Sequence, residues 1–161
     1  MRSTALASLA LAAALLGCGS DPSGPQRRRP APELRATPVR VTLDGTELLL
    51  ESFLWRDFQP ISPPDGKPLI AVFRVKAADG SDVPQSVRAD AAWVVFGNDV
   101  WAARVVEEQP RSALPTGFEV VARNGPTWGP GASVDVIVQL RDAASRAVLL
   151  RAADQPIHRT D

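Results

Sequence analysis

The chain has 161 residues and carries 18 basic and 18 acidic side chains, so its formal net charge is zero. A chain without a basic excess lacks the electrostatic footprint that nucleic acid requires, and we expect no nucleic-acid partner. The single cysteine, Cys18, excludes a disulfide bond within the chain. Hydrophobic residues make up 45% of the sequence, which is enough to build the core of one domain.

The N-terminus has the layout of a secretory signal. Arg2 precedes an uncharged stretch, Ala5 to Gly17, that is apolar along most of its length and ends in small residues. A helix that spans a bilayer needs about 20 apolar residues, so this stretch is too short to cross one. Residues 1–17 are therefore predicted to be a signal peptide.

The end of this stretch, Leu15-Leu16-Gly17-Cys18, resembles the lipobox of bacterial lipoproteins. The resemblance implies cleavage between Gly17 and Cys18, a lipid on the Cys18 sulfur and acylation of the new amine. It also implies a membrane as the partner of the anchor and the cell envelope as the location. Gly19 stands where an aspartate retains lipoproteins in the inner membrane, which implies the outer membrane if the host has two. An ordinary secretory peptide with an incidental cysteine is the alternative.

Residues 19–38 differ in composition from the rest of the chain, because they are rich in proline and arginine and poor in large apolar residues. Such a segment buries too little apolar surface to order itself. We therefore expect residues 18–38 to be the lipidated cysteine followed by a disordered tether. Arg27 to Arg29 either contact anionic lipid head groups or only keep the tether solvated.

From Val39 onward, apolar and polar residues alternate with the period of a β-strand, and turn-forming residues separate the alternating runs. The run Glu47–Trp55 is almost continuously apolar, which predicts cover on both of its faces. Alanine-rich Ala143–Ala153 is a strand or, as the alternative, a short helix. No other helix is expected after residue 17. The predicted strands are Val39–Leu43, Glu47–Trp55, Leu69–Ala77, Val87–Val95, Val100–Val106, Phe118–Ala122, Val134–Leu140 and Ala147–Ala152.

These strands predict an all-β fold, a single antiparallel β-sandwich of about seven to eight strands over residues 39–157, with a C-terminal tail at 158–161. The stretch Gly131 to Asp142 resembles a late strand of immunoglobulin-like domains, which implies an immunoglobulin-like sandwich. The chain lacks the cysteine pair and the corner tyrosine of true immunoglobulin domains. Five side chains on apolar strand faces are predicted to be buried together: Phe73, Trp93, Val120, Val136 and Val138.

No cluster of residues predicts catalysis, a metal ion or a cofactor. The single histidine, His158, lies near Asp154 and Asp161 and is predicted to be an exposed tail residue. Glu107 and Glu108 are adjacent and point to opposite faces of a strand, so we expect them to be solvated rather than to act as a pair of catalytic acids.

Aromatic residues in loops are the candidates for binding. Trp128 lies between Pro126 and Pro130, where the backbone has little freedom, so an exposed indole there would lose little entropy on binding. The alternative is that Trp128 folds back and covers the end of the sandwich. Trp55 to Phe58 form a second aromatic patch or end a core strand, and the alternation around Trp101 leaves its face open. The candidate binding residues are Trp128, Pro126, Thr127 and Trp101.

These features predict a non-enzymatic envelope lipoprotein with a binding or structural role toward a protein or glycan. Only analogy of fold supports that role, because sandwiches of this kind have many functions. One alternative is a proteinase-inhibitor-like sandwich that acts through loops such as Asn124–Gly131. The other is an envelope enzyme that uses carboxylates.

Overall fold

The computed structural model describes residues 29–114 and 116–161. The predicted signal peptide, Cys18 and the first part of the predicted tether lie outside these residues. The described chain forms eight strands, which confirms the predicted all-β fold, and none of its helices has the length and hydropathy that a membrane-spanning helix requires. The strands are β1 (Val41–Leu43), β2 (Thr46–Asp57), β3 (Ile70–Ala77), β4 (Arg88–Phe96), β5 (Asp99–Arg104), β6 (Gly117–Ala122), β7 (Ser133–Arg141) and β8 (Ala147–Thr160). Two short helical segments, α1 (Ala31–Arg35) and the 3-10 turn η1 (Arg111–Ala113), complete the elements.

The strands form because apolar residues alternate with polar ones, so that one face of most strands is buried; in β5 the inward residues Trp101 and Ala103 are only partly buried. In β7 the side chains of Val134, Val136 and Val138 are buried, whereas Ser133 is exposed. Alanine-rich β8 is also a strand, because its alternation allows Leu150 and Ala152 to enter the core. Tertiary burial therefore outweighs the helix preference of alanine there.

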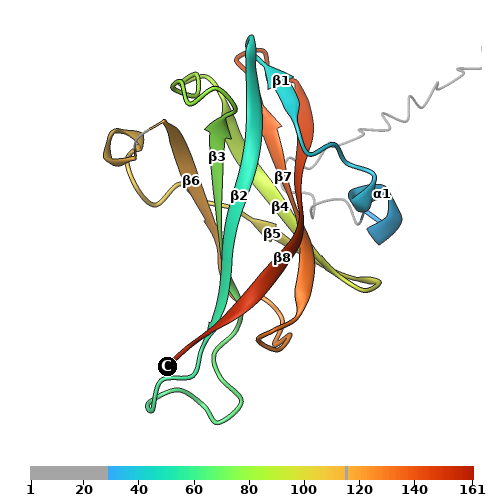
Figure 1. The fold of residues 1–161 in the computed structure, drawn as a ribbon, viewed down its shortest axis with the longest axis vertical. Helices are drawn as coiled ribbons and strands as arrows, with labels where there is room; N and C mark the ends of the chain where they lie inside the picture. The colour runs from blue at the N-terminus through green and yellow to red at the C-terminus, as the bar shows by residue number, and fades with distance from the viewer. Residues whose placement is uncertain (1–28, 115) are drawn as a thin grey trace, which may run out of the picture.

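The strands lie in the order β5-β4-β7-β8-β2-β3-β6, and β1 pairs with β2 outside this path (Figure 1). All pairs are antiparallel except β2 with β8, where Leu54 to Asp57 run parallel to Ile157 to Thr160. The expected antiparallel arrangement is thus wrong for this one pair. The predicted tail at 158–161 is wrong as well, because residues up to Thr160 belong to β8 and pair with β2.

Strand β8 takes part in two pairings. Its first part pairs with β7 and its last four residues pair with β2. Just before the change of partner, two residues of β8, Ala153 and Asp154, lie opposite the single residue Asp135 of β7, and Gln155 and Pro156 still pair with β7 after them. Asp154 has a φ of 55°, in the left-handed region. This β-bulge bends the strand, as bulges do, and directs it from one part of the sheet to the other.

The sheet curls so that its two ends meet. Val106, just after β5, and Val121 of β6 exchange backbone hydrogen bonds of 3.2 and 2.9 Å. The result is sandwich-like, with a half A (β1, β2, β3, β6 and the end of β8) facing a half B (β4, β5, β7 and the start of β8). The core between the halves contains four of the five side chains predicted to be buried together: Phe73, Val120, Val136 and Val138.

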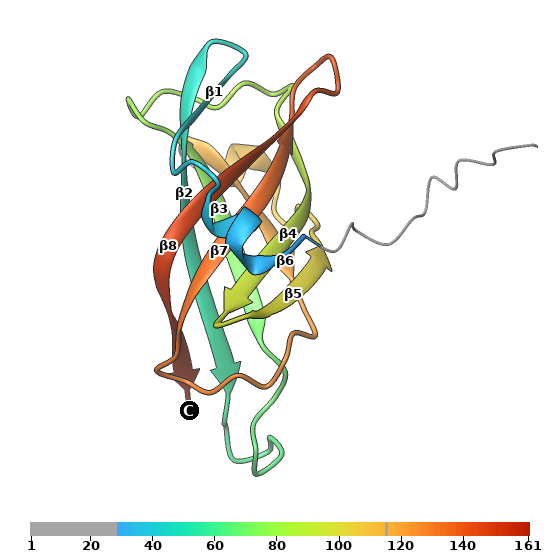
Figure 2. The same ribbon diagram turned by 90° about the vertical axis from the view of Figure 1, so that its right-hand side faces the viewer.

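Trp93 is buried, with 2% of its surface exposed, but it lies outside this core. Strand β4 is apolar on both faces, so that Ala92 and Val94 enter the core while Trp93 points outward from half B. Helix α1 covers that outer face with Ala31 and Leu34 (Figure 2). The prediction that Trp93 packs with the other four residues is therefore wrong, because alternation alone does not say which apolar face meets the core.

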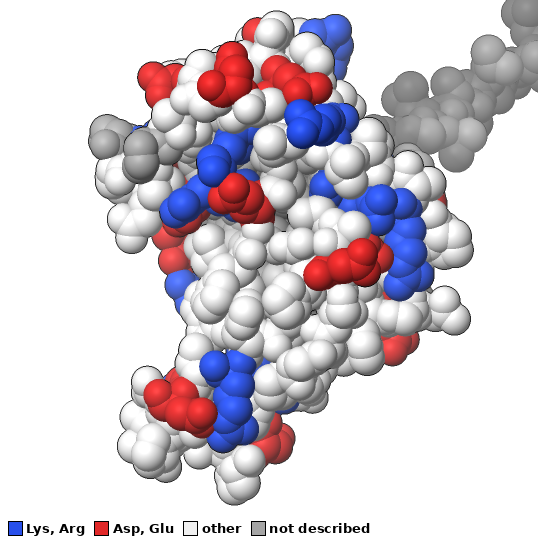
Figure 3. Space-filling model, in the orientation of Figure 1, with Lys and Arg blue, Asp and Glu red and all other residues white. Residues whose placement is uncertain are grey.

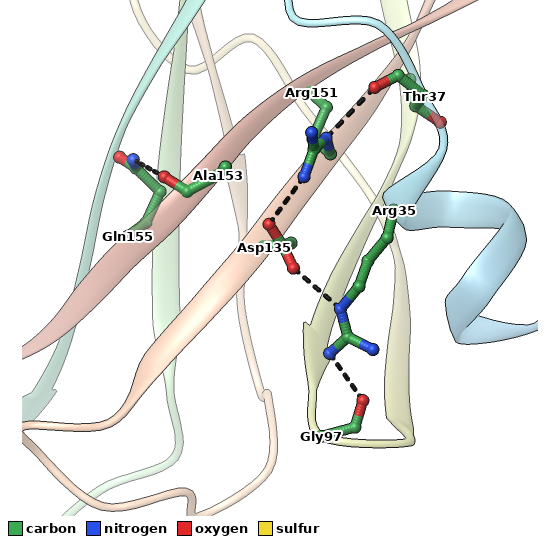
Figure 4. A network of polar contacts seen from close by, with 7 residues as sticks. All are labelled: Arg35, Thr37, Gly97, Asp135, Arg151, Ala153 and Gln155. Atoms are coloured by element: carbon green, nitrogen blue, oxygen red, sulfur yellow. Dashed lines mark hydrogen bonds and ion pairs between the residues drawn. The ribbon is translucent and has the colours of Figure 1, made fainter.

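A network of polar contacts fastens the segment after α1 to half B (Figure 4). Asp135 accepts hydrogen bonds from Arg35 Nε at 2.9 Å and from Arg151 Nη1 at 3.1 Å. Arg151 Nε also donates to the Thr37 carbonyl at 3.1 Å, and Arg35 Nη2 donates to the Gly97 carbonyl at 2.6 Å. One carboxylate thus links the N-terminal segment with two strands of half B.

Residues 29–38 are therefore part of the domain, and the prediction of a disordered tether is wrong for them. The prediction rested on the average composition of the segment, which gave no weight to two apolar residues, Ala31 and Leu34. They lie on one face of a single helical turn. Their burial against Trp93, together with the arginine contacts, offsets the entropy lost on ordering.

We expect Leu34→Ala to lower the free energy of unfolding by about 2–5 kcal/mol. Leu34 is fully buried on the inner face of α1, and truncating its side chain leaves a cavity against Trp93. The matched control is Glu33→Ala on the exposed side of the same helix, with an expected loss below about 1 kcal/mol. Urea denaturation of the two variants measures the difference. Equal stabilities would show that α1 is only loosely attached.

Candidate functional site

Four apolar side chains form a row across the outer face of half A, which we call the apolar band: Phe53, Val72, Val121 and Val106. Each is paired with the next across neighbouring strands, in the order β2, β3, β6 and the chain after β5. Directly paired residues project from the same face of a sheet. Phe53 is 48% exposed and Val106 is 61% exposed, so no described residue covers the two ends of the band.

An aromatic cluster extends the apolar band toward β8. His158 lies opposite Trp55 in the parallel pair, and its ring stacks on Phe53 with centroids 4.7 Å apart and planes 18° apart. The Trp55 ring lies 5.4 Å from Phe53 at an angle of 34°. His158 is exposed, as predicted, but a strand and not a tail holds it in place. Phe53 thus contacts both other rings, and its stacking with His158 covers part of both rings.

Charged side chains border the apolar band, and Figure 3 shows an uncharged area of this face with charged groups around it. On one side, Arg74 Nε donates to Glu119 at 2.8 Å and Lys76 donates to Glu51 at 2.8 Å. A groove of about 180 Å³ lies between these charges and Phe53. An apolar centre with a polar rim is the usual anatomy of a protein interface.

Beyond Val121 the rim continues with an ion pair between Arg123 and Glu108, whose Nη2 and Oε2 atoms are 2.7 Å apart. The hydrogen bonds that Arg123 donates lower the pKa of the Glu108 carboxyl and raise the pKa of the guanidinium. Both groups therefore stay charged at neutral pH, and the rim keeps its polarity.

The candidate binding residues from the sequence lie at one end of the sandwich. Trp101 packs against the core, beneath Gly125, where an added Cβ would come within 2.7 Å of the indole ring. Trp128 is half-buried against the same core and contacts Phe96, with ring centroids 5.5 Å apart. Both tryptophans thus contribute to packing at this end, as in the alternative in which Trp128 covers the sandwich.

The two neighbours of Trp128 differ in exposure. Pro126 is partly buried, whereas the Thr127 side chain is exposed. The Thr127 carbonyl accepts a 3.1 Å hydrogen bond from Nη1 of Arg56, a buried residue of β2. The loop between β6 and β7 is therefore held close to the end of β2. A direct binding role for Trp128, Pro126, Thr127 and Trp101 stays a prediction.

A polar cleft of about 960 Å³ lies between the β3–β4 and β5–β6 connections, and its lining includes Glu107 and Glu108. Glu107 is held by Arg111 at 2.8 Å, and Arg111 also lies over the Phe118 ring. A general acid needs a carboxyl with a raised pKa, but the pKa of Glu108 is lowered. In the part of the chain that the structure describes, no three metal-ligating side chains converge.

Reasoning from the sequence missed the apolar band. The signal was present in β2, where Glu51, Phe53 and Trp55 occupy alternate positions, but the near-continuous apolar run suggested that both faces are covered. In the described structure only the face with Leu50 and Leu54 enters the core. Val106 joins the band through a bridge between distant parts of the chain, which no local pattern reveals.

Comparison of the chain with protein-family models, curated proteins and solved structures finds no match. The geometry and chemistry of the chain's own residues therefore carry any functional assignment.

We expect Trp128→Ala to lower the free energy of unfolding by about 2 kcal/mol, because a half-buried indole that packs on the core and on Phe96 is removed. Thr127→Ala is the matched control, with an expected change within about 0.5 kcal/mol, since only its carbonyl makes a contact. Thermal melts of both variants test this. An unchanged melting temperature for Trp128→Ala would show that the indole does not stabilise the fold and would favour a binding role for it.

Proposed function

We propose that the protein is a lipid-anchored, non-enzymatic envelope module that binds a partner protein through the apolar band. The observation that supports this most directly is the exposure of Phe53 and Val106 at the two ends of a continuous apolar row. A contiguous exposed apolar patch with a polar rim is typical of interaction sites on protein surfaces.

The position of the N-terminal segment is consistent with this role. Helix α1 and residues 35–38 are attached to the outer face of half B, and the apolar band lies on the outer face of half A (Figures 1 and 2). A chain that reaches the domain from Cys18 enters it on the side of half B. The band is then free to meet a partner while the protein stays anchored.

The aromatic cluster favours a protein over a glycan as the partner. Sugar rings bind best to open aromatic ring faces, where their C–H groups meet the negative charge of the π system. Phe53 and His158 stack on each other, so one face of each ring is already covered. Val72, Val121 and Val106 continue the surface with aliphatic side chains, which complement an apolar protein surface better than a sugar ring.

The lipid anchor is tested at the mature N-terminus. We expect mass spectrometry to find an acylated Cys18 as the first residue, because Leu15-Leu16-Gly17-Cys18 resembles a lipobox. Cys18→Ser should move the protein from the membrane fraction to the released fraction. An unmodified Cys18, or cleavage at another peptide bond, would contradict the anchor without affecting the binding face.

The binding face is tested with the full lipoprotein, purified with its partners after crosslinking in cells. We expect Phe53→Asp and Val106→Asp to reduce the recovered partner at least about tenfold, since each places a charge at an exposed position of the apolar band. Val39→Asp is the matched control, because Val39 is 48% exposed, like Phe53, but lies between α1 and β1.

Thermal melts establish that the three variants remain folded. Equal recovery of the partner with all of them would refute the proposal. Sedimentation with purified cell-wall glycan, if it depended on Phe53, would assign the band to a glycan instead.

A further inference from the structure

The connection between β2 and β3, residues 58–69, projects beyond the end of the sheet (Figure 1). Ile61 lies in this connection and is 87% exposed, more than any other large hydrophobic residue that the structure describes. A side chain that stays in water contributes no burial energy to the fold. The structure of the loop around Ile61 therefore decides whether the side chain is held in a fixed position where a partner can bind it.

Two successive β-turns fix the backbone around Ile61. The Ser62 amide donates to the Gln59 carbonyl at 2.7 Å, and the Gly66 amide donates to the Pro63 carbonyl at 2.8 Å. Proline occupies the second position of both turns, as Pro60 and Pro64, and this is the position that its fixed φ suits best. The loop has therefore lost much of its conformational freedom before it meets any partner.

The base of the loop is clamped by a buried arginine. Arg56 is 4% exposed, and its guanidinium donates to the carbonyls of Lys67 at 2.9 Å, of Thr127 at 3.1 Å and of Asp65. Lys67 is itself tied to Asp57 by an ion pair of 2.7 Å and by a backbone hydrogen bond of 2.9 Å. Arg56, at the end of β2, thus holds the returning end of the loop through Asp65 and Lys67 and joins it to the β6–β7 loop through Thr127.

Phe58 supports the loop from beneath. The guanidinium carbons of Arg56 and Arg159 lie over its ring, at 5.1 and 4.1 Å from the ring centroid. Gly66, with a φ of 75°, lies directly on the same ring, where a Cβ would come within 2.6 Å. A side chain at Gly66 would be strained by the positive φ and would have to displace the Phe58 ring, so glycine allows the loop to rest directly on that ring.

We propose that Ile61 is a preorganised knob that inserts into an apolar pocket on a partner protein. A rigid loop binds with little further loss of entropy, which makes one exposed aliphatic side chain an effective anchor. The Asp65 carboxylate is exposed and forms no ion pair with another described residue, so a basic group at the rim of the partner's pocket would complement the loop.

A lipid surface fits the loop less well than a protein pocket. One isoleucine contributes too little apolar area for stable membrane attachment, and the Asp65 carboxylate is repelled by anionic head groups. The Gln59–Ser62 turn also folds the backbone around Ile61, so contact is made through the side chain and not by adding an extended strand to a partner's sheet.

The test is photocrosslinking with the full-length lipoprotein in its own envelope. A benzophenone amino acid replaces Ile61, or Val39 in the matched control, and adducts are identified by mass spectrometry. Purified domain is then added as competitor in four forms: unaltered, Ile61→Val, Ile61→Asp and Phe53→Asp. Thermal melts check that each competitor is folded, which the exposure of Ile61 leads us to expect.

We expect a crosslinked protein adduct when the benzophenone is at position 61, and no adduct of the same mass when it is at position 39. Unaltered domain and Ile61→Val should compete equally, whereas Ile61→Asp should need an about 30-fold higher concentration, as for the loss of a hot-spot side chain. Three results would each overturn the proposal: competition by Ile61→Asp at the same concentration as the unaltered domain, adducts to lipid alone, or no adduct from position 61. The Phe53→Asp competitor separates the two surfaces, because it should compete fully if the knob acts independently of the apolar band.

Discussion

Strand β8 belongs to both halves of the sheet, and this sharing fixes how the rest of the molecule is arranged. The bulge at Ala153 and Asp154 lies just before the change of partner: Gln155 and Pro156 still pair with β7, and from Ile157 onward the strand pairs with β2. A straight strand would continue along half B and leave β2 without a neighbour on that side. The bulge costs a residue with positive φ, a conformation that aspartate tolerates better than most residues. In return, the last strand closes the core and places His158 against Phe53.

Arginine provides many of the contacts that join separate parts of the chain. Arg56 binds the loops at one end through carbonyl oxygens, and Arg151 binds the Thr37 carbonyl as well as Asp135. The planar guanidinium has five donors in fixed directions, so one side chain can satisfy several backbone groups at once. Exposed ion pairs contribute little to stability, whereas these partly buried contacts also satisfy backbone carbonyls.

The positions of the strands could be read from the sequence because alternation reports burial directly. Each of the eight predicted runs overlaps an observed strand, including alanine-rich β4 and β8. Alternation carries no information about what covers a second apolar face, so the place of Trp93 under α1 was not predictable from β4 alone. The parallel pairing of β2 with β8, and the joining of Val106 to Val121, depend on contacts between distant segments. The apolar band is assembled by pairings of β2 with β3, of β3 with β6 and of Val106 with Val121, which is why loop tryptophans looked like better candidates than Phe53.

The order of pairing along the chain has a consequence for how the domain folds. β8 follows every other described strand, and both halves of the sheet pair with it. Contacts between residues far apart in sequence form slowly. The sheet therefore cannot be completed before β8 has been synthesised, and the edges of β2 and β7 that β8 covers stay unpaired until then.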